Sequence, residues 1–323
     1  MNIGSNAGWT MTVLTPETGS DAGAAGARRR IRRGRLRARW TGWGFVAPFF
    51  LVFLFALVAP IVYAVYLSLF QDKLIGGNRF AGFANYTEAF KDPQFWAGFE
   101  RVALFLVVQV PVMLVLALAV AFAVDSARLH WTPLYRIAVF LPYAVPAVVG
   151  ALMWGFMYGT QFGLVSEFDR WFHVNLPDPL GNSLMLPAIG NIVTWEYVGY
   201  NMLIFYSALR VIPHDIYEAA ELDNAGAWRI IWHIKLPALR PAMLLATVFS
   251  IIGSFQLFTE PAVLYPIAKD QIGSAYTPNW YAYNLSFNGQ EYNYSATIAI
   301  VMGLLTVIVA YLVQRLGQRK QGA

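Results

Sequence analysis

Two clusters of polar side chains interrupt long apolar stretches of this sequence, and they are its candidates for chemistry. The first lies in NIVTWEYVGYN and comprises Asn191, Glu196, Tyr197, Tyr200 and Asn201. The second lies in SIIGSFQLFTE and comprises Ser250, Ser254, Gln256, Thr259 and Glu260. Carboxyl and amide groups beside aromatic rings suit a neutral polyhydroxylated ligand, because the polar groups bind hydroxyls while the rings pack on the apolar face of a sugar.

The same clusters also have a purely structural interpretation. Ser, Thr, Asn and Gln side chains hydrogen-bond between helices in membrane bundles, and carboxylates near the membrane interface can reach water. Glu196, about a third of the way along its apolar segment, is costly there unless it faces a water-filled space or has a partner. Helical spacing puts residues 193, 196, 197 and 200 on one face. The sequence leaves both interpretations open.

Motifs for enzyme chemistry are missing from the sequence. It has no GxxxxGK[ST], HExxH or GxSxG segment, no cysteine, and four histidines without metal-ligand spacing. We therefore expect neither a catalytic site nor a bound cofactor or metal. Arginines crowd residues 28–39, but they precede an apolar segment, which favours contact with lipid and a role in topology over nucleic-acid binding.

The composition indicates an integral membrane protein. Hydrophobic residues make up 58% of the 323 residues, charged residues only 13%, and the mean hydropathy is +0.49. A hydrocarbon core of about 30 Å needs about 20 apolar residues in a helix. Six segments meet this requirement, so the sequence predicts an all-α fold with spans at about 45–69, 102–124, 134–158, 186–209, 242–258 and 296–313.

The distribution of basic residues predicts the orientation. Most of the 23 Lys and Arg lie in the N-terminal tail, in the links 125–136 and 210–240, and at the C-terminal end. Cytoplasmic segments carry such an excess, so both termini and the 210–240 link are expected in the cytoplasm. We divide the chain into a disordered basic tail (1–41), a six-span membrane domain (42–318) and a short cytoplasmic tail (319–323).

A polar, amphipathic stretch, EAAELDNAGAWRIIWHIKLP at 218–237, separates the fourth and fifth predicted spans. Pro213 can open a helix that runs to about Asp223, and Asn224 and Gly226 then permit a turn. A second short helix would present Trp228, Ile231 and Trp232 on one side, with Pro237 and Pro241 marking its end. A polar interruption of this size in a membrane chain needs a partner surface.

This stretch resembles the EAA loop of permease subunits in binding-protein-dependent ABC importers, whose pattern is EAA, three residues, Gly, nine residues, Ile-x-Leu-Pro. The residues that match in register are Glu218, Ala219, Ala220, Asp223, Ile234, Leu236 and Pro237, with Asn224 at the glycine position and Gly226 beyond it in the turn. Asn tolerates the left-handed conformation next best after glycine, so the loop geometry should survive. LPYAVP, FANYTEAF, DPQFW and GSFQLFTEP resemble the carbohydrate-uptake branch, which includes the large membrane subunit of the maltose transporter.

The resemblance covers about residues 42–318 and implies a six-helix type I importer core in a bacterial inner membrane. Its implied partners are a second permease, two ATP-binding subunits and an extracytoplasmic solute-binding protein, with Glu218 pairing a basic group of the ATPase. The positions implied to contact sugar are Tyr143, Glu196, Tyr197, Tyr200, Ser254 and Thr259, to which the polar cluster adds Gln256. After Glu260 the segment LYPIAKD stands where the family usually has TxGGP, so the family's contact with the binding protein does not carry over to this loop.

Two other classes of function compete with this one. A polyprenol-linked membrane glycosyltransferase using Glu196 or Glu260 as a base would need acidic clusters on a loop near the interface and large soluble loops, and the sequence shows neither. A proton- or ion-coupled secondary transporter would often show inverted repeats, and the two halves of the chain show no convincing similarity.

Overall fold

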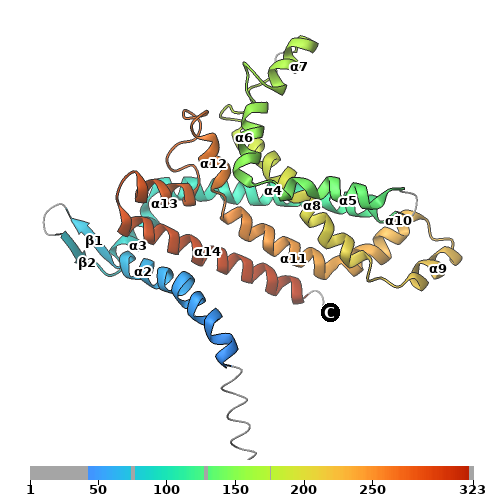
Figure 1. The fold of residues 1–323 in the computed structure, drawn as a ribbon, viewed down its shortest axis with the longest axis horizontal. Coiled ribbons are helices and arrows are strands. Elements are labelled where there is room, and N and C mark those ends of the chain that lie inside the picture. Colours follow the sequence, from blue (N-terminus) through green and yellow to red (C-terminus); the bar gives the residue numbers. More distant parts are fainter. Residues whose placement is uncertain (1–42, 74–76, 127–129, 175, 320–323) are drawn as a thin grey trace, which may run out of the picture. The chain divides into compact units, whose positions relative to one another are not determined.

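The computed structural model describes residues 43–73, 77–126, 130–174 and 176–319 (Figure 1). The predicted tail at 1–41 and all but the first residue of the predicted C-terminal tail lie outside the described residues. The chain divides into two units, residues 1–62 and 63–323. The described part of the first unit is helical, and all packing reported below lies within the second.

Four stretches among the described residues are long and apolar enough to cross a membrane. They are Trp43–Ser68, Pro93–Val124, Ala227–Leu264 and Tyr292–Gln318. The first includes a π-helical turn, η1 (Leu54–Val58), and α2 (Ala59–Ser68); the others contain α4 (Pro93–Val124), α11 (Leu236–Phe255) and α14 (Tyr292–Arg319). These stretches overlap the first, second, fifth and sixth predicted spans.

The third predicted span, 134–158, is not one straight helix. It consists of α5 (Thr132–Phe140), a 3₁₀ turn η2 (Leu141–Ala144) and α6 (Ala147–Met157), and the two halves meet at 94°. The cause is Pro146, which disfavours helical backbone at Val145, where ψ is 131°. Counted as one span, the bent pair brings the total among the described residues to five.

The fourth predicted span, 186–209, corresponds to α8 (Met185–Leu209). Its 25 residues give a helix about 37 Å long, enough to cross a bilayer. α8 is not among the four stretches above, because the polar residues of the first cluster lower its mean hydropathy. The six-span count therefore stays a prediction.

Four helices form the core of the second unit. α4 packs along α8, and α11 packs against α4, α8 and α14, so the four lie side by side in Figure 1. Gly199 permits the closest approach, between α8 and α5, since a Cβ there would lie well inside contact distance of the Val139 carbonyl oxygen. Met202, Phe205 and Leu239 are fully buried in the same region.

Smaller elements join the ends of these helices. They are the antiparallel hairpin β1 (Phe70–Lys73) and β2 (Gly77–Phe80), α3 (Ala84–Lys91), α7 (Leu164–Phe172), α12 (Thr259–Leu264) and α13 (Pro278–Phe287). The hairpin was not predicted from the sequence. Asp92 holds one junction: its Oδ1 accepts the Gln94 N–H and caps α4, while its Oδ2 accepts the hydroxyls of Tyr281 and Tyr294, each at 2.8 Å.

Candidate functional site

A cavity of about 290 Å³ lies between α4, α8 and the end of α11. The residues from α4 and α6 are Phe105, Gln109, Met113 and Ala147, and those from α8 are Val193, Tyr197, Tyr200 and Asn201. The remaining wall runs along α11 and beyond its end, and comprises Phe249, Ser250, Gly253, Ser254, Gln256, Leu257, Thr259 and Glu260. Spacings of three and four residues put the α8 side chains on one helical face, as expected.

Five of the seven predicted ligand residues line this cavity: Tyr197, Tyr200, Ser254, Gln256 and Thr259. The last two reach it because helix stops at Phe255 and resumes at Thr259. Pro261 has no N–H to give to the Leu257 carbonyl, which accepts the Thr277 hydroxyl at 3.0 Å instead. The chain can therefore turn around the end of the cavity without leaving the Leu257 carbonyl unpaired.

The other two predicted residues, Tyr143 and Glu196, do not line the cavity. The Tyr143 ring stacks on Tyr200 with centroids 4.8 Å apart, so it supports a wall residue. Glu196 is 4% exposed, and its Oε1 has no hydrogen-bond partner. It occupies the space left by Gly150 of α6, where a Cβ would come within 2.6 Å of that oxygen. Glu196 thus lies behind the wall.

Two amides in the wall were not among the predicted ligand residues. Gln109 is the single polar residue between Val102 and Val124 of α4, which is the signal that could have identified it, and it donates to the Thr194 hydroxyl at 3.2 Å. Asn201 is 2% exposed and donates to the Tyr197 carbonyl at 3.0 Å. Its Oδ1 has no partner among the described residues. The wall therefore offers amide groups in addition to hydroxyls.

The polar stretch after α8 forms a helical hairpin of α9 (His214–Leu222) and α10 (Ala227–Ile230). Pro213 precedes the first helix, and α9 ends one residue before the predicted Asp223. Asn224 has a φ of +54°, which confirms the expected left-handed turn. Gly226, in contrast, has a φ of −65° and opens α10 in an extended conformation. Asn224 is thus the residue that reverses the chain.

The prediction that the second helix ends near Pro237 and Pro241 was wrong. α10 continues through a π-helical segment, η3 (Ile231–Lys235), directly into α11. Pro237 falls in the first turn of α11 and Pro241 inside it. A wider π turn leaves room near a proline and changes the local hydrogen-bond pattern, so the helix passes these residues unbroken. Ile234, Leu236 and Pro237 are half-buried along this stretch.

The hairpin leaves large apolar side chains exposed. Leu222 is 84% exposed, Trp228 74% and Trp232 63%, and Ile231 is half-buried. Glu218 is also exposed, and among the described residues its side chain meets only His214, at 3.1 Å. Indole and leucine side chains gathered around a turn form the kind of surface that binds another protein.

One ion pair ties the hairpin to α4. Lys235 Nζ lies 2.7 Å from Asp125 Oδ2, and the two side chains are 14% and 11% exposed. The same ammonium lies over the rings of Phe122 and Tyr217. Burial and the Asp125 charge raise the pKa of the Tyr217 hydroxyl, partly offset by Arg210. The contact is thus largely withdrawn from water and fixes η3 on the end of α4.

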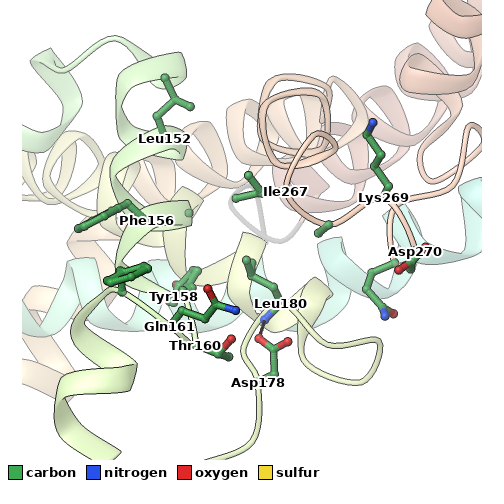
Figure 2. Close-up of a pocket in the computed structure, with 15 residues that line it drawn as sticks. Leu152, Phe156, Tyr158, Thr160, Gln161, Asp178, Leu180, Ile267, Lys269 and Asp270 are labelled. Carbon is green, nitrogen blue, oxygen red and sulfur yellow. Dashed lines mark hydrogen bonds between the residues drawn. The ribbon is translucent and has the colours of Figure 1, made fainter.

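A second, larger cavity of about 630 Å³ lies at the end of α6 (Figure 2). Its polar side chains include Gln161, Asp178, Lys269 and Asp270, and Asp178 Oδ1 accepts the Leu180 N–H at 2.9 Å. Ile267 and the two charged residues beside it belong to the LYPIAKD segment that departs from the family pattern. None of the predicted ligand residues lines this cavity.

Residues 101–322 match the model of the binding-protein-dependent transport system inner membrane component family. The chain belongs to this family. It is 30% identical over 281 residues to the lactose transport system permease protein LacF of Rhizobium radiobacter, covering 84% of this chain and 92% of that protein. It is 27% identical to the diacetylchitobiose uptake system permease protein NgcF of Streptomyces coelicolor, covering 94% and 90%. The chain is thus a non-catalytic transport subunit of the membrane.

The fold also matches solved structures. A chain of a bacterial ABC transporter involved in the import of the acidic polysaccharide alginate superimposes with a TM-score of 0.78, covering 90% of this chain and 99% of that one at 18% identity. A second structure of an alginate transporter, in complex with an alginate pentasaccharide-bound periplasmic protein, gives the same TM-score at 17% identity. This likeness establishes the importer permease fold.

Proposed function

We propose that this chain is the membrane subunit of an ATP-driven sugar importer and that the cavity between α4, α8 and α11 is its part of the sugar path. The observation that carries this proposal is the wall of the cavity. Hydroxyl, amide and carboxyl groups alternate there with the rings of Phe105, Tyr197 and Tyr200. Similar permeases are named for lactose and diacetylchitobiose transport, which supports a sugar as the ligand.

The sugar site is shared with a second, homologous permease. Small-molecule sites usually enclose about 300–1,000 Å³, and the cavity of about 290 Å³ lies just below that range. An oligosaccharide needs more room than this chain supplies. A second permease facing the cavity would complete the site.

The α9–α10 hairpin is the docking element for an ATP-binding subunit. Its exposed Leu222, Trp228 and Trp232 supply apolar anchors, and Glu218 supplies a carboxylate for a basic group. The matched residues Ala219, Ala220 and Asp223, with Asn224 at the glycine position, build the helix and turn that present them. Closure of two ATP-binding subunits would move both hairpins and switch the cavity between outward and inward exposure. This arrangement requires the hairpin and both termini in the cytoplasm.

An extracytoplasmic solute-binding protein delivers the sugar. The family is named for its dependence on such a protein, and this argues against a self-sufficient secondary transporter and against a glycosyltransferase. In the proposed orientation the cavity in Figure 2 opens outward, and its mixed charges, from Asp178, Lys269 and Asp270, suit contact with a protein surface.

Reversal of the Glu218 charge tests the coupling role. We expect Glu218→Lys to abolish uptake and sugar-stimulated ATP hydrolysis while membrane insertion stays normal. Glu167→Lys, which makes the same charge change at an exposed site on α7, is the matched control and should transport normally. Normal uptake by Glu218→Lys would contradict the coupling role.

Removal of one hydroxyl tests the sugar path. In Thr259→Val the cavity loses a hydrogen-bonding group at almost constant volume, so half-saturation for uptake should rise several-fold. Thr247→Val is the control, because the Thr247 hydroxyl donates to the Met243 carbonyl of its own helix and does not line the cavity. Sugar-stimulated ATP hydrolysis, screened over disaccharides with the assembled complex, identifies the substrate. If no sugar stimulates hydrolysis, the proposal fails.

A further inference from the structure

The charges around the cavity have one sign. Glu260 is the one carboxylate in its wall, and no Lys, Arg or His is among the described residues that line it. Glu260 is 6% exposed. An acidic group this well buried normally has a cation or several hydrogen-bond donors beside it. Among the described residues Glu260 makes no ion pair, and it borders open space instead.

Glu196 adds a second acidic group directly behind the wall. It is 4% exposed and likewise makes no ion pair among the described residues. In its ionised form, either carboxyl group creates a negative potential that no lining cation offsets and that a narrow cavity screens only weakly.

Two buried acceptor oxygens in this region have no hydrogen-bond partner among the described residues. Glu196 Oε1 behind the wall and Asn201 Oδ1 in the wall are buried without a partner. An acceptor is satisfied by a ligand that supplies an O–H or N–H group. A carboxylate or sulfonate group placed against these oxygens supplies no donor, so it would leave them unpaired and would also be repelled by an ionised carboxyl group.

We propose that Glu260, assisted by Glu196, makes the path selective against anionic sugars and open to those that present only hydroxyl or amine groups. This inference rests on the proposed function, because it assumes that the cavity takes a sugar. The fold does not dictate the sign of the substrate charge, since the similar alginate importer transports an acidic polysaccharide. The side chains of this chain must therefore decide it.

A set of three disaccharides with one linkage tests the charge selectivity. The probes are cellobiose, which is neutral, its di-amino analogue, and its analogue with one uronic acid. Binding to the assembled importer in nanodiscs, without ATP or binding protein, isolates the permease from the specificity of the delivery protein. We expect the acid to bind at least tenfold more weakly than cellobiose, and the amine at least as tightly as cellobiose.

Variants show which residues cause the discrimination, measured as the affinity for the uronic acid divided by the affinity for cellobiose. Glu260→Gln keeps the shape of the wall and should raise that ratio at least tenfold, and Glu196→Gln should raise it about threefold. Glu88→Gln, at an exposed site on α3, is the control and should leave it unchanged. If one of these two glutamine variants does not assemble, the other alone tests the charge selectivity.

Two results would overturn the charge selectivity alone: an acid that binds wild type within threefold of cellobiose, or a ratio that neither glutamine variant changes. In both cases cellobiose binding would leave the sugar function standing. If none of the three disaccharides binds and none stimulates ATP hydrolysis, the proposed function and this inference fail together.

Discussion

The ion pair between Lys235 and Asp125 should be a major stabilising contact of the hairpin region. Its two atoms are 2.7 Å apart and its side chains only 14% and 11% exposed. Replacing Lys235 by Met keeps the apolar stem but leaves a carboxylate buried without a cation, which typically costs about 3–5 kcal/mol. Because both side chains keep some contact with water, we expect Lys235→Met to lower the free energy of unfolding by about 2–4 kcal/mol.

The double variant Lys235→Met/Asp125→Leu separates the cost of an orphaned charge from the value of the pair. With both charges gone, unfolding should return to within about 1 kcal/mol of wild type. The measurement is equilibrium unfolding of the purified chain in mixed micelles, at pH 7 and constant lipid ratio.

A matched control exists on α7. Arg170 and Glu167 are 2.9 Å apart but 65% and 53% exposed, so Arg170→Met should cost less than about 1 kcal/mol. The reasoning is refuted if Lys235→Met costs no more than this control, or if the double variant is as unstable as the sum of its single changes.

Three further predictions concern backbone geometry and one junction. Gly199→Ala should lower thermal stability by about 1–3 kcal/mol or more, because its Cβ would meet the backbone carbonyl of Val139, which has little freedom to move. Asn224→Val should disturb the hairpin turn and reduce uptake, whereas Asn224→Gly should not, because glycine accepts a φ of +54° freely and a β-branched side chain accepts it only with strain. Asp92→Ala should lower the free energy of unfolding by about 2–4 kcal/mol in thermal unfolding. It removes the α4 cap and the oxygen that accepts the hydroxyls of Tyr281 and Tyr294.

The sequence predicted the features that depend on local chemistry. Apolar length placed the long helices, and the turn at Asn224 followed from the few residue types that accept a positive φ. The polar residues of α8 and of the segment after Phe255 were recognised because lipid makes such residues costly. Five of the seven predicted ligand residues do meet in one cavity, and the two from α8 lie on one helical face.

Features that depend on tertiary contact could not be predicted in this way. The bend at Pro146 and the unbroken passage at Pro237 involve the same residue type with opposite outcomes. The difference lies in the hydrogen bonds of the backbone next to each proline. A π turn rearranges them before Pro237, and a single sequence does not reveal such a turn. Glu196 similarly looked like a wall residue, but the absence of a side chain at Gly150 lets it lie behind the wall.

The unbroken helix past Pro237 connects the hairpin to the cavity. From Ala227 to Phe255 the chain forms about 44 Å of continuous helix, with the exposed tryptophans near its start and Ser254 near its end. Lys235 fixes the first part to α4, and the Asn279 side chain donates to the Phe255 carbonyl at 2.8 Å and fixes the last. A helix held at both ends transmits a displacement with little bending, whereas a loop at Pro237 would absorb it. A force on the hairpin would therefore act on the cavity wall, which is the mechanical requirement of coupled transport.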